Sequence, residues 1–441
     1  MTWHRQSPVR LAEYAFRLLP AYLLIPGGAA AAIQLTTGSS GAPAAVVSAA
    51  SAALLLTSAA LWRRDLWTES GRLARRRGLL RSEEHELRRE LLTAVELKQT
   101  PLGTMLGAVT VSAYSSGDLL TRERCRLVLG REDGLRLIRR LLPQEKERVR
   151  RFSTSMRRAA IMALTSGGLF SDLLLTVPIV SWFAKHAVPS LPAAVALFPV
   201  TGWLLHFVSA LLSCGGFRTV RTGGMMTAVR GIVVRRTLRF PLSAVSAVET
   251  RRTPLSLLLG VSRTDALIAG YGRCVLLPAS DRRETRVELA SLFPHGEPGV
   301  CVRSDGSIYW CRQQLALAAA AALFTLRLAV HAGGMCGAVL CIGLPAAAVI
   351  LRQALVYALA GRKASVRTFG DCVEICGVRG AGAVKLRVMR GCIAQVKLVQ
   401  HPFQRACGRC SLYILPRGMR RGIWCRHLPY RRCLSLIGRL G

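Results

Sequence analysis

Two stretches of the chain decide the fold, because they are copies of one another. The first is Leu92-Thr-Ala-Val-Glu-Leu-Lys-Gln-Thr-Pro-Leu-Gly-Thr-Met-Leu-Gly107, and the second is Val245-Ser-Ala-Val-Glu-Thr-Arg-Arg-Thr-Pro-Leu-Ser-Leu-Leu-Leu-Gly260. An offset of 153 residues superposes them without a gap. A third stretch, Ile393 to Gly408, keeps the spacing from Pro402 to Gly408. Internal self-similarity of this kind predicts that one structural unit is used three times.

Each copy has the pattern of short strands followed by a helix. Polar and apolar residues alternate from Ala94 to Lys98, which is typical of a half-buried strand. Pro101 ends that strand because it fixes φ and has no N–H to donate. Gly107 opens the next strand, expected over 108–114, and a helical spacing follows at Leu135, Ile138, Leu141 and Leu142. We therefore expect a small β-barrel or sandwich closed by a C-terminal helix, with a second helix over 286–293 and a less regular basic segment over 426–440.

The composition combines strong positive charge with apolar character. The 441 residues carry a formal net charge of +37, and 51% of them are hydrophobic. Disorder goes with low hydrophobicity, so a disordered chain is excluded. We interpret the balance as that of an integral membrane protein with basic soluble parts.

The apolar residues gather in six runs near the length of a spanning helix, which is about 20 residues. They are arranged in pairs, and the short linkers within the pairs contain one basic residue, Lys185. The long segments between and after the pairs are basic, with net charges of +7, +8 and +15. The runs are 15–35, 42–61, 159–183, 188–212, 315–330 and 335–360.

The positive-inside rule then places both termini and all three long segments in the cytoplasm of a multi-pass membrane protein. The expected fold class is a membrane protein of mixed α and β structure, with three transmembrane helical hairpins each followed by a β-barrel capped by a helix. The expected domains are hairpins at 14–61, 159–212 and 315–360, and soluble units at 62–150, 213–312 and 361–441.

Charged residues suggest two kinds of site. Asp172, Arg327 and Arg352 lie within apolar runs, where charges are costly and are either paired or functional. Basic clusters next to the runs could bind anionic lipid headgroups. The candidates for this contact are Arg75, Arg76, Arg77, Arg235, Arg236, Arg420 and Arg421. The plainer interpretations, a structural ion pair and solvated basic faces, stay open.

Other chemistry finds less support. Cys407-Gly-Arg-Cys410 has the spacing of a zinc knuckle, and Cys372 and Cys376 would have to complete the site. The other copies lack these cysteines, so we prefer to interpret them as scattered thiols. We therefore expect no metal or cofactor. A nucleic-acid partner is disfavoured because no helix-turn-helix or stacking-aromatic motif accompanies the charge. Motifs of the common hydrolases and nucleotide-binding enzymes are missing, so we expect no enzyme.

At the repeated residues the chain resembles the bacterial membrane-flanked proteins with pleckstrin-homology-like (PH-like) domains, of the YdbT type. The resemblance is carried by Arg77-Gly78 and Thr100-Pro101-Leu102 with Gly107, and by Arg230-Gly231 and Thr253-Pro254-Leu255 with Gly260. It implies PH-type barrels of about seven strands capped by one helix, which usually bind lipids, peptides or other domains. It also suggests a link to envelope stress or antimicrobial-peptide resistance.

Two functions follow as hypotheses. The first is a non-enzymatic, membrane-tethered scaffold at the bacterial cytoplasmic membrane, whose repeats bind anionic lipids or a membrane or cytoplasmic protein. The alternative is a transport or export accessory that uses Asp172, Arg327 and Arg352. The sequence leaves the ligand and the oligomeric state open.

Overall fold

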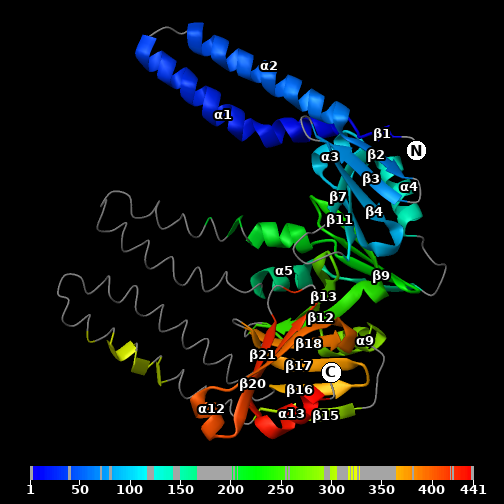
Figure 1. Ribbon diagram of the computed structural model, residues 1–441, viewed down its shortest axis with the longest axis vertical. Coiled ribbons are helices and arrows are strands. Elements are labelled where there is room, and N and C mark those ends of the chain that lie inside the picture. The colour runs from blue at the N-terminus through cyan, green and yellow to red at the C-terminus, as the bar shows by residue number, and fades with distance from the viewer. Residues whose placement is uncertain are drawn as a thin grey trace. The chain divides into compact units, whose positions relative to one another are not determined.

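The computed structural model (Figure 1) divides into two compact units. Unit 1 comprises Met1–Glu147 and Val233–Phe240, and unit 2 comprises Arg148–Ile232 and Pro241–Gly441. The structure describes residues 3–37, 41–69, 72–78, 82–116, 124–142, 149–165, 201–304 with short gaps, a few helical residues between 316 and 327, 364–379, 382–417, 419 and 422–438.

Unit 1 begins with two long helices that run side by side and lead into antiparallel strands (Figure 1). Neighbouring strands follow the orders β1-β2-β3-β4 and β7-β6-β5-β11. The elements are β1 (His4–Arg5), α1 (Val9–Thr37), α2 (Gly41–Arg64), β2 (Leu66–Glu69), β3 (Arg72–Arg77), β4 (Glu83–Arg88), the 3₁₀ turn η1 (Arg89–Leu91), β5 (Leu92–Gln99), α3 (Pro101–Met105), β6 (Ala108–Ser115), β7 (Arg124–Gly130), α4 (Arg131–Leu141) and β11 (Arg235–Pro241).

Unit 2 contains most of two further series of strands, each with a 3₁₀ turn and a closing helix, although β11 of the second series belongs to unit 1. Its neighbouring strands are β10-β9-β8, then β14-β13-β12-β18-β17-β16-β15, then β19-β20-β21. The elements are β8 (Val149–Ser153), α5 (Met156–Thr165), β9 (Arg218–Thr222), β10 (Met225–Arg230), η2 (Leu242–Ala244), β12 (Val245–Arg252), β13 (Ser262–Ile268), β14 (Gly272–Ser280), α9 (Arg282–Leu292), β15 (Pro298–Arg303), β16 (Ser365–Phe369), β17 (Cys372–Arg379), β18 (Gly382–Met389), η4 (Arg390–Cys392), β19 (Ile393–Val399), α12 (Pro402–Ala406), β20 (Arg409–Pro416), β21 (Ile423–Pro429) and α13 (Tyr430–Gly438).

In the first and third copies the Pro-to-Gly motif builds one short helix between two strands, α3 or α12. Thr100 caps α3 by accepting a hydrogen bond from the Gly103 N–H, and Pro101 occupies the first helical position, where a missing N–H costs nothing. Gly107 then adopts φ +64°, and Gly260 and Gly408 adopt φ +69° and +62°. Left-handed backbone of this kind favours glycine. The motif is therefore structural in all three copies.

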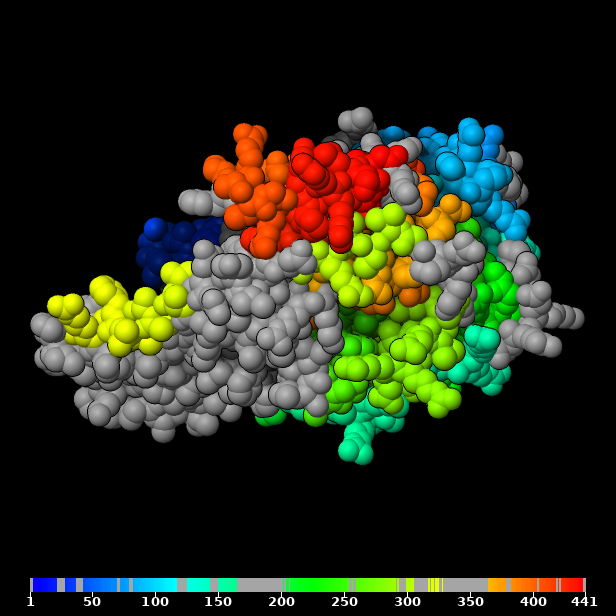
Figure 2. Space-filling view, turned by 90° about the horizontal axis from the view of Figure 1, so that it is seen from below, coloured from blue at the N-terminus to red at the C-terminus, as the bar shows by residue number. Residues whose placement is uncertain are grey.

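The core of each copy lies between its sheet and its closing helix. Leu137, Ile138 and Leu141 of α4 are buried, and Gly134 lets the helix approach the side chain of Val109. In the last copy Cys433 and Leu436 of α13 are fully buried, and the helix lies at the surface beside β15 (Figure 2). The closing helices were expected from the spacing of apolar residues, although the basic segment 426–440 divides between β21 and α13.

The prediction of three transmembrane hairpins is wrong. Within the described residues one helical segment, Pro43–Arg64 of α2, is long and apolar enough to span a membrane, and 6% of its most apolar window is buried. The described structure is otherwise a mixed α and β fold dominated by antiparallel sheets. Most of the runs 159–183, 188–212, 315–330 and 335–360 lies outside the described residues.

Packing against protein explains part of this correction. The third run was expected to enter lipid at Ala159, yet Ala159, Met162 and Ala163 are buried in α5, which contacts β14. Apolar composition alone does not tell these environments apart. The predicted domain boundaries and the cytoplasmic termini stay predictions.

Candidate functional site

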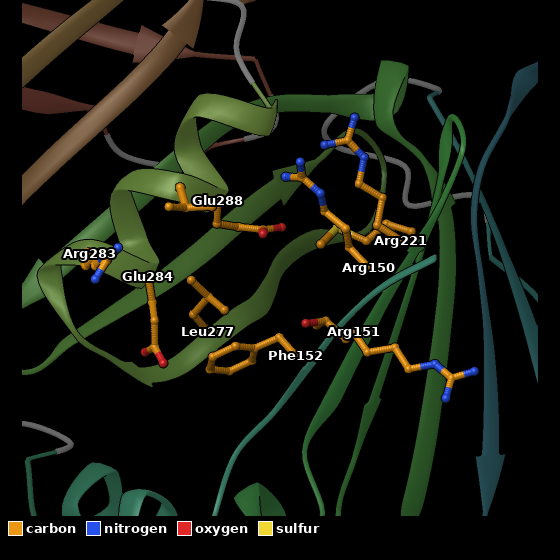
Figure 3. Close-up of a pocket in the computed structure, with 11 residues that line it drawn as sticks. Arg150, Arg151, Phe152, Arg221, Leu277, Arg283, Glu284 and Glu288 are labelled. Atoms are coloured by element: carbon orange, nitrogen blue, oxygen red, sulfur yellow. The ribbon is translucent and has the colours of Figure 1, made fainter. Parts of the chain in front are cut away.

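A pocket of about 400 Å³ in unit 2 lies between the first two strands of the second copy and its closing helix (Figure 3). Strand β8 supplies Arg150, Arg151 and Phe152, β9 supplies Thr219 and Arg221, and α9 supplies Arg283, Glu284, Val287 and Glu288. Met226 and Leu277 complete an apolar part of the lining. An apolar pocket with a few convergent charged groups is the usual form of a ligand site.

The strand register forces two arginines together at this pocket. In the antiparallel pair of β8 and β9, Arg150 lies directly opposite Arg221. Residues opposite one another share a face, and like charges in this position are destabilising. Figure 3 shows both guanidinium groups on the same side of the pocket, near Glu288 of α9. The strand register thus brings two arginines and one carboxylate into the lining of the same pocket.

The two acids of the pocket have different roles. Glu284 is bound by Arg158 of α5 at 2.9 and 3.0 Å, so its charge is already balanced. Burial raises the pKa of the Glu288 carboxyl, and the nearby charges of Arg221 and Arg150 lower it. Burial has the larger effect, so the pKa is raised overall. Protonation of Glu288 would make the pocket more positive.

Unit 1 has a pocket of about 560 Å³ in the corresponding place, between its first strand and α4. Its charges are mixed, because Arg5, Arg136 and Arg140 are accompanied by Glu69 and Asp133. Arg140 lies 3.5 Å from Glu69. The same position in the fold is thus hollow in two copies, but the excess of arginine is greater in the second.

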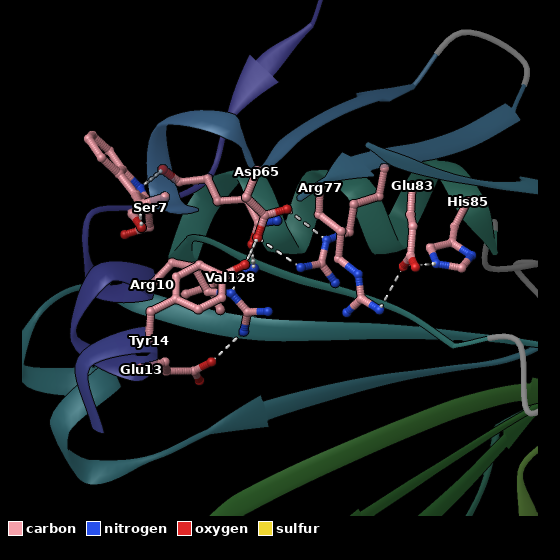
Figure 4. A network of polar contacts seen from close by, with 12 residues as sticks. Ser7, Arg10, Glu13, Tyr14, Asp65, Arg77, Glu83, His85 and Val128 are labelled. Carbon is pink, nitrogen blue, oxygen red and sulfur yellow. Dashed lines mark hydrogen bonds and ion pairs between the residues drawn. The ribbon is translucent and has the colours of Figure 1, made fainter. Parts of the chain in front are cut away.

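A separate network of charges is buried in unit 1, where the two long helices meet the sheet (Figure 4). Asp65, directly after α2, is fully buried and accepts two hydrogen bonds of 2.8 Å from Arg75 of β3. Tyr14 of α1 donates to the same carboxylate at 2.6 Å, and Arg10 lies 3.5 Å from it. Burial of Arg75 lowers the pKa of its guanidinium, but the hydrogen bonds that it donates to Asp65 and the charge of that carboxylate outweigh burial and raise the pKa.

Glu13 extends this network to a second strand. It pairs with Arg10 on its own helix and accepts a hydrogen bond of 2.7 Å from Arg126 of β7. Nearby, Gln6 accepts a hydrogen bond from the Val128 N–H. These contacts fix the base of the helical pair to the domain, and we call the set Asp65, Arg75, Arg10, Tyr14 and Glu13 the anchor network.

The described headgroup candidates have different surroundings. Arg75 is buried in the anchor network and is unavailable to a headgroup. Arg76 is exposed and donates to Ser82, while Arg77 pairs with Glu83 at 3.4 Å. Arg235 is exposed, and Arg236 lies 3.8 Å from Glu96.

The remaining predicted residues lie largely outside the described part. Arg420, Arg421, Asp172 and Arg352 are not among the described residues, and Arg327 is an exposed helical residue. The proposed pairing of Asp172 with Arg327 or Arg352 stays a prediction.

The cysteines of the third copy lie in different environments. Cys407 is exposed, whereas Cys410, Cys425 and Cys433 are buried, and burial raises the pKa of the Cys425 thiol. In the described residues no three His, Cys, Asp or Glu side chains are placed to hold a metal ion.

Comparison with known proteins agrees with a PH-like unit at the N-terminal end. The family described as bacterial PH domain matches residues 14–145, which hold the helical pair and the first copy of the fold. The match supports a bacterial PH-like domain over these residues. Neither the curated proteins nor the solved structures provide a match. The YdbT type stays a resemblance.

Sequence reasoning missed the pocket and Asp65. Arg150 and Arg221 are far apart along the chain, and only strand pairing brings them together. Asp65 did leave a signal, because it is the acid that directly follows the apolar run ending near Leu61.

Proposed function

We propose that this chain is a membrane-associated binding scaffold whose second PH-like unit holds the headgroup of an anionic lipid between Arg150 and Arg221. A PH-like domain supports a binding or scaffold role in general. The specific observation behind the proposal is the direct opposition of Arg150 and Arg221 on paired strands. Like charges in that position cost stability, and arginine forms strong, geometrically defined bonds with phosphate, so a phosphate beside Glu288 would favour the arrangement.

Membrane association is supported by the exposure of unit 1. The side chains of Leu55 and Leu56 on α2 are largely exposed, as are Leu102, Met105 and Leu106 at α3. Apolar helices and exposed apolar patches of this kind suit a lipid or protein contact. We infer a location at the bacterial cytoplasmic membrane from these features together with the positive charge.

The test uses the full chain in neutral detergent, titrated with short-chain phosphatidylglycerol and, in parallel, with short-chain phosphatidylcholine. We expect phosphatidylglycerol to bind more tightly, and the double variant Arg150→Ser/Arg221→Ser to weaken that binding at least tenfold. The matched control is Arg431→Ser/Arg432→Ser, which removes two exposed arginines of α13. It should bind phosphatidylglycerol as the unaltered protein does.

Two results would overturn the proposal. One is equal binding of both lipids by the unaltered protein. The other is equal weakening by the pocket variant and the control, since that would mean that net charge alone governs the affinity. Circular dichroism of each variant distinguishes a lost site from a lost fold.

A further inference from the structure

One three-part element occurs in every copy: a strand, a 3₁₀ turn and a second strand. The three examples are β4-η1-β5, β11-η2-β12 and β18-η4-β19. In each, the second strand pairs on one side with the strand that follows it in its own copy, namely β6, β13 or β20. What differs between the copies is the other side of that second strand.

In the first two copies that other side is occupied by the next copy. β5 pairs antiparallel with β11, and β12 pairs antiparallel with β18. The two junctions have the same register: Glu96 lies opposite Leu238, and the equivalent Glu249 lies opposite Leu386. Each of those leucines is at the same distance along the chain from its following 3₁₀ turn. A junction formed twice in one register is a defined interface between copies.

The third copy differs at this strand. Among the described strands, β19 pairs only with β20, and β4 at the other end of the series pairs only with β3. The burial differs accordingly. Val95 of β5 and Val248 of β12 are 0% and 1% exposed, whereas the equivalent Val396 of β19 is half-buried, and Gln395 and Lys397 are exposed. A strand edge with unpaired backbone groups is a template for pairing with another chain.

The two open strands are complementary in charge. β4 carries Glu83, Glu84 and Glu86, all exposed, together with Arg88, while β19 carries Lys397 and no acid. Glu83 and Glu86 form exposed ion pairs with Arg77 and Arg72 of β3, which lower but do not remove the negative charge of this edge. Two β4 strands would oppose one another through their glutamates. β19 and β4 do not repel one another in this way. In the register of the internal junctions, Lys397 would lie opposite His85 and diagonal to Glu83, and Val396 would lie opposite Glu86.

We propose that β19 of one molecule pairs antiparallel with β4 of a second copy, in the register of the two internal junctions. The contact is heterologous, because a different surface of each molecule takes part. Heterologous contacts generate rings when the rotation closes and open filaments when it does not. The chain is thus a three-copy segment of an assembly that continues head to tail through backbone hydrogen bonds. This inference does not depend on lipid binding.

The first test compares masses of the full chain in neutral detergent over a range of concentrations, by sedimentation velocity. We expect the mean mass to rise with concentration, and the reversal Glu84→Lys/Glu86→Lys to require at least tenfold more protein for the same mass. The control Glu90→Lys/Glu132→Lys reverses two exposed charges outside β4. A protein that stays monomeric throughout, or a control that matches the β4 variant, would overturn the proposal.

The second test reads the register directly. One preparation carries Glu86→Cys and another carries Val396→Cys, both with the exposed Cys301 and Cys407 changed to Ser. Oxidation of the mixture should give a covalent dimer that neither preparation gives alone. The out-of-register control pairs Glu86→Cys with Leu398→Cys, which the junction register places opposite Glu84. Dimer yields that do not favour the Val396 pair over this control would rule the register out.

Discussion

Arginine has opposite surroundings in two regions of this molecule. In the anchor network of unit 1, Arg75 is buried and meets the two oxygens of Asp65, with Tyr14 on the same carboxylate. At the pocket of unit 2, Arg150 faces Arg221 across a strand pair, and Glu288 is the acid of the lining that Arg158 does not bind. The first arrangement is complete within the protein and stabilises it. The second places two like charges opposite one another, and the proposed headgroup site rests on that arrangement.

The largest effect should follow from opening the anchor network. Asp65→Ala leaves Arg75 buried without its carboxylate, and breaking a buried pair in this way costs about 3–5 kcal/mol. We expect that loss in the free energy of unfolding of the full chain, measured by denaturant titration. Glu86→Ala, which breaks the exposed pair with Arg72, should cost about 1 kcal/mol or less. Similar costs for both variants would remove the distinction between the two regions.

A smaller loss should follow when both partners are removed together. Asp65→Leu/Arg75→Leu leaves no unpaired charge between the two positions, so we expect it to be more stable than Asp65→Ala. The same denaturant titration gives the comparison. A double variant that is less stable than Asp65→Ala would mean that the network contributes more than the pairing of these two charges.

The pH dependence of lipid binding tests the role of Glu288 at the pocket. Because burial raises the pKa of its carboxyl, the group takes up a proton as the pH falls through that pKa, and the pocket then loses its negative charge. Binding of phosphatidylglycerol should therefore tighten as the pH is lowered from 8 towards 5. Glu288→Gln should bind several-fold more tightly at pH 8 and lose this dependence. A pH profile unchanged by Glu288→Gln would assign the effect to other groups.

The smallest effect is a change in thiol reactivity beside the anchor network. Burial raises the pKa of Cys125 to about 11, and its side chain is 4% exposed, so it should resist maleimide while Cys301 and Cys407 react. In Asp65→Ala we expect Cys125 to react faster as the network opens. Peptide mass spectrometry of timed labelling gives both rates. Equal rates before and after the change would show that Cys125 does not report on Asp65.

Local structure could be predicted well from the sequence. The Thr100-Pro101 and Gly107 signals predicted where β5 ends and β6 begins, because capping and positive φ depend on residue types at fixed spacing. The closing helix α4 followed from the spacing of its apolar residues. Such features are decided by neighbours along the chain.

Features that depend on residues far apart in the sequence were harder to predict. Arg75 has the same sequence context as Arg76, yet strand alternation turns one inward to Asp65 and the other outward. The apolar run from Ala159 matches a spanning helix in composition, although its first turns pack against β14. Arg150 and Arg221 come together only when β8 and β9 pair. Tertiary contacts, which composition does not encode, decide each of these cases.

The junction of β5 with β11 also has a consequence for synthesis. Unit 1 is built from two separate pieces of chain, and its second piece, Val233–Phe240, follows the first only after residues 148–232 have been made. At a translation rate of about 5–20 residues per second, the ribosome needs roughly 5–20 s to reach Phe240 after it has finished Glu147. During that interval β5 presents an unpaired edge on the nascent chain, so the order and timing of translation bear on how safely the first unit matures.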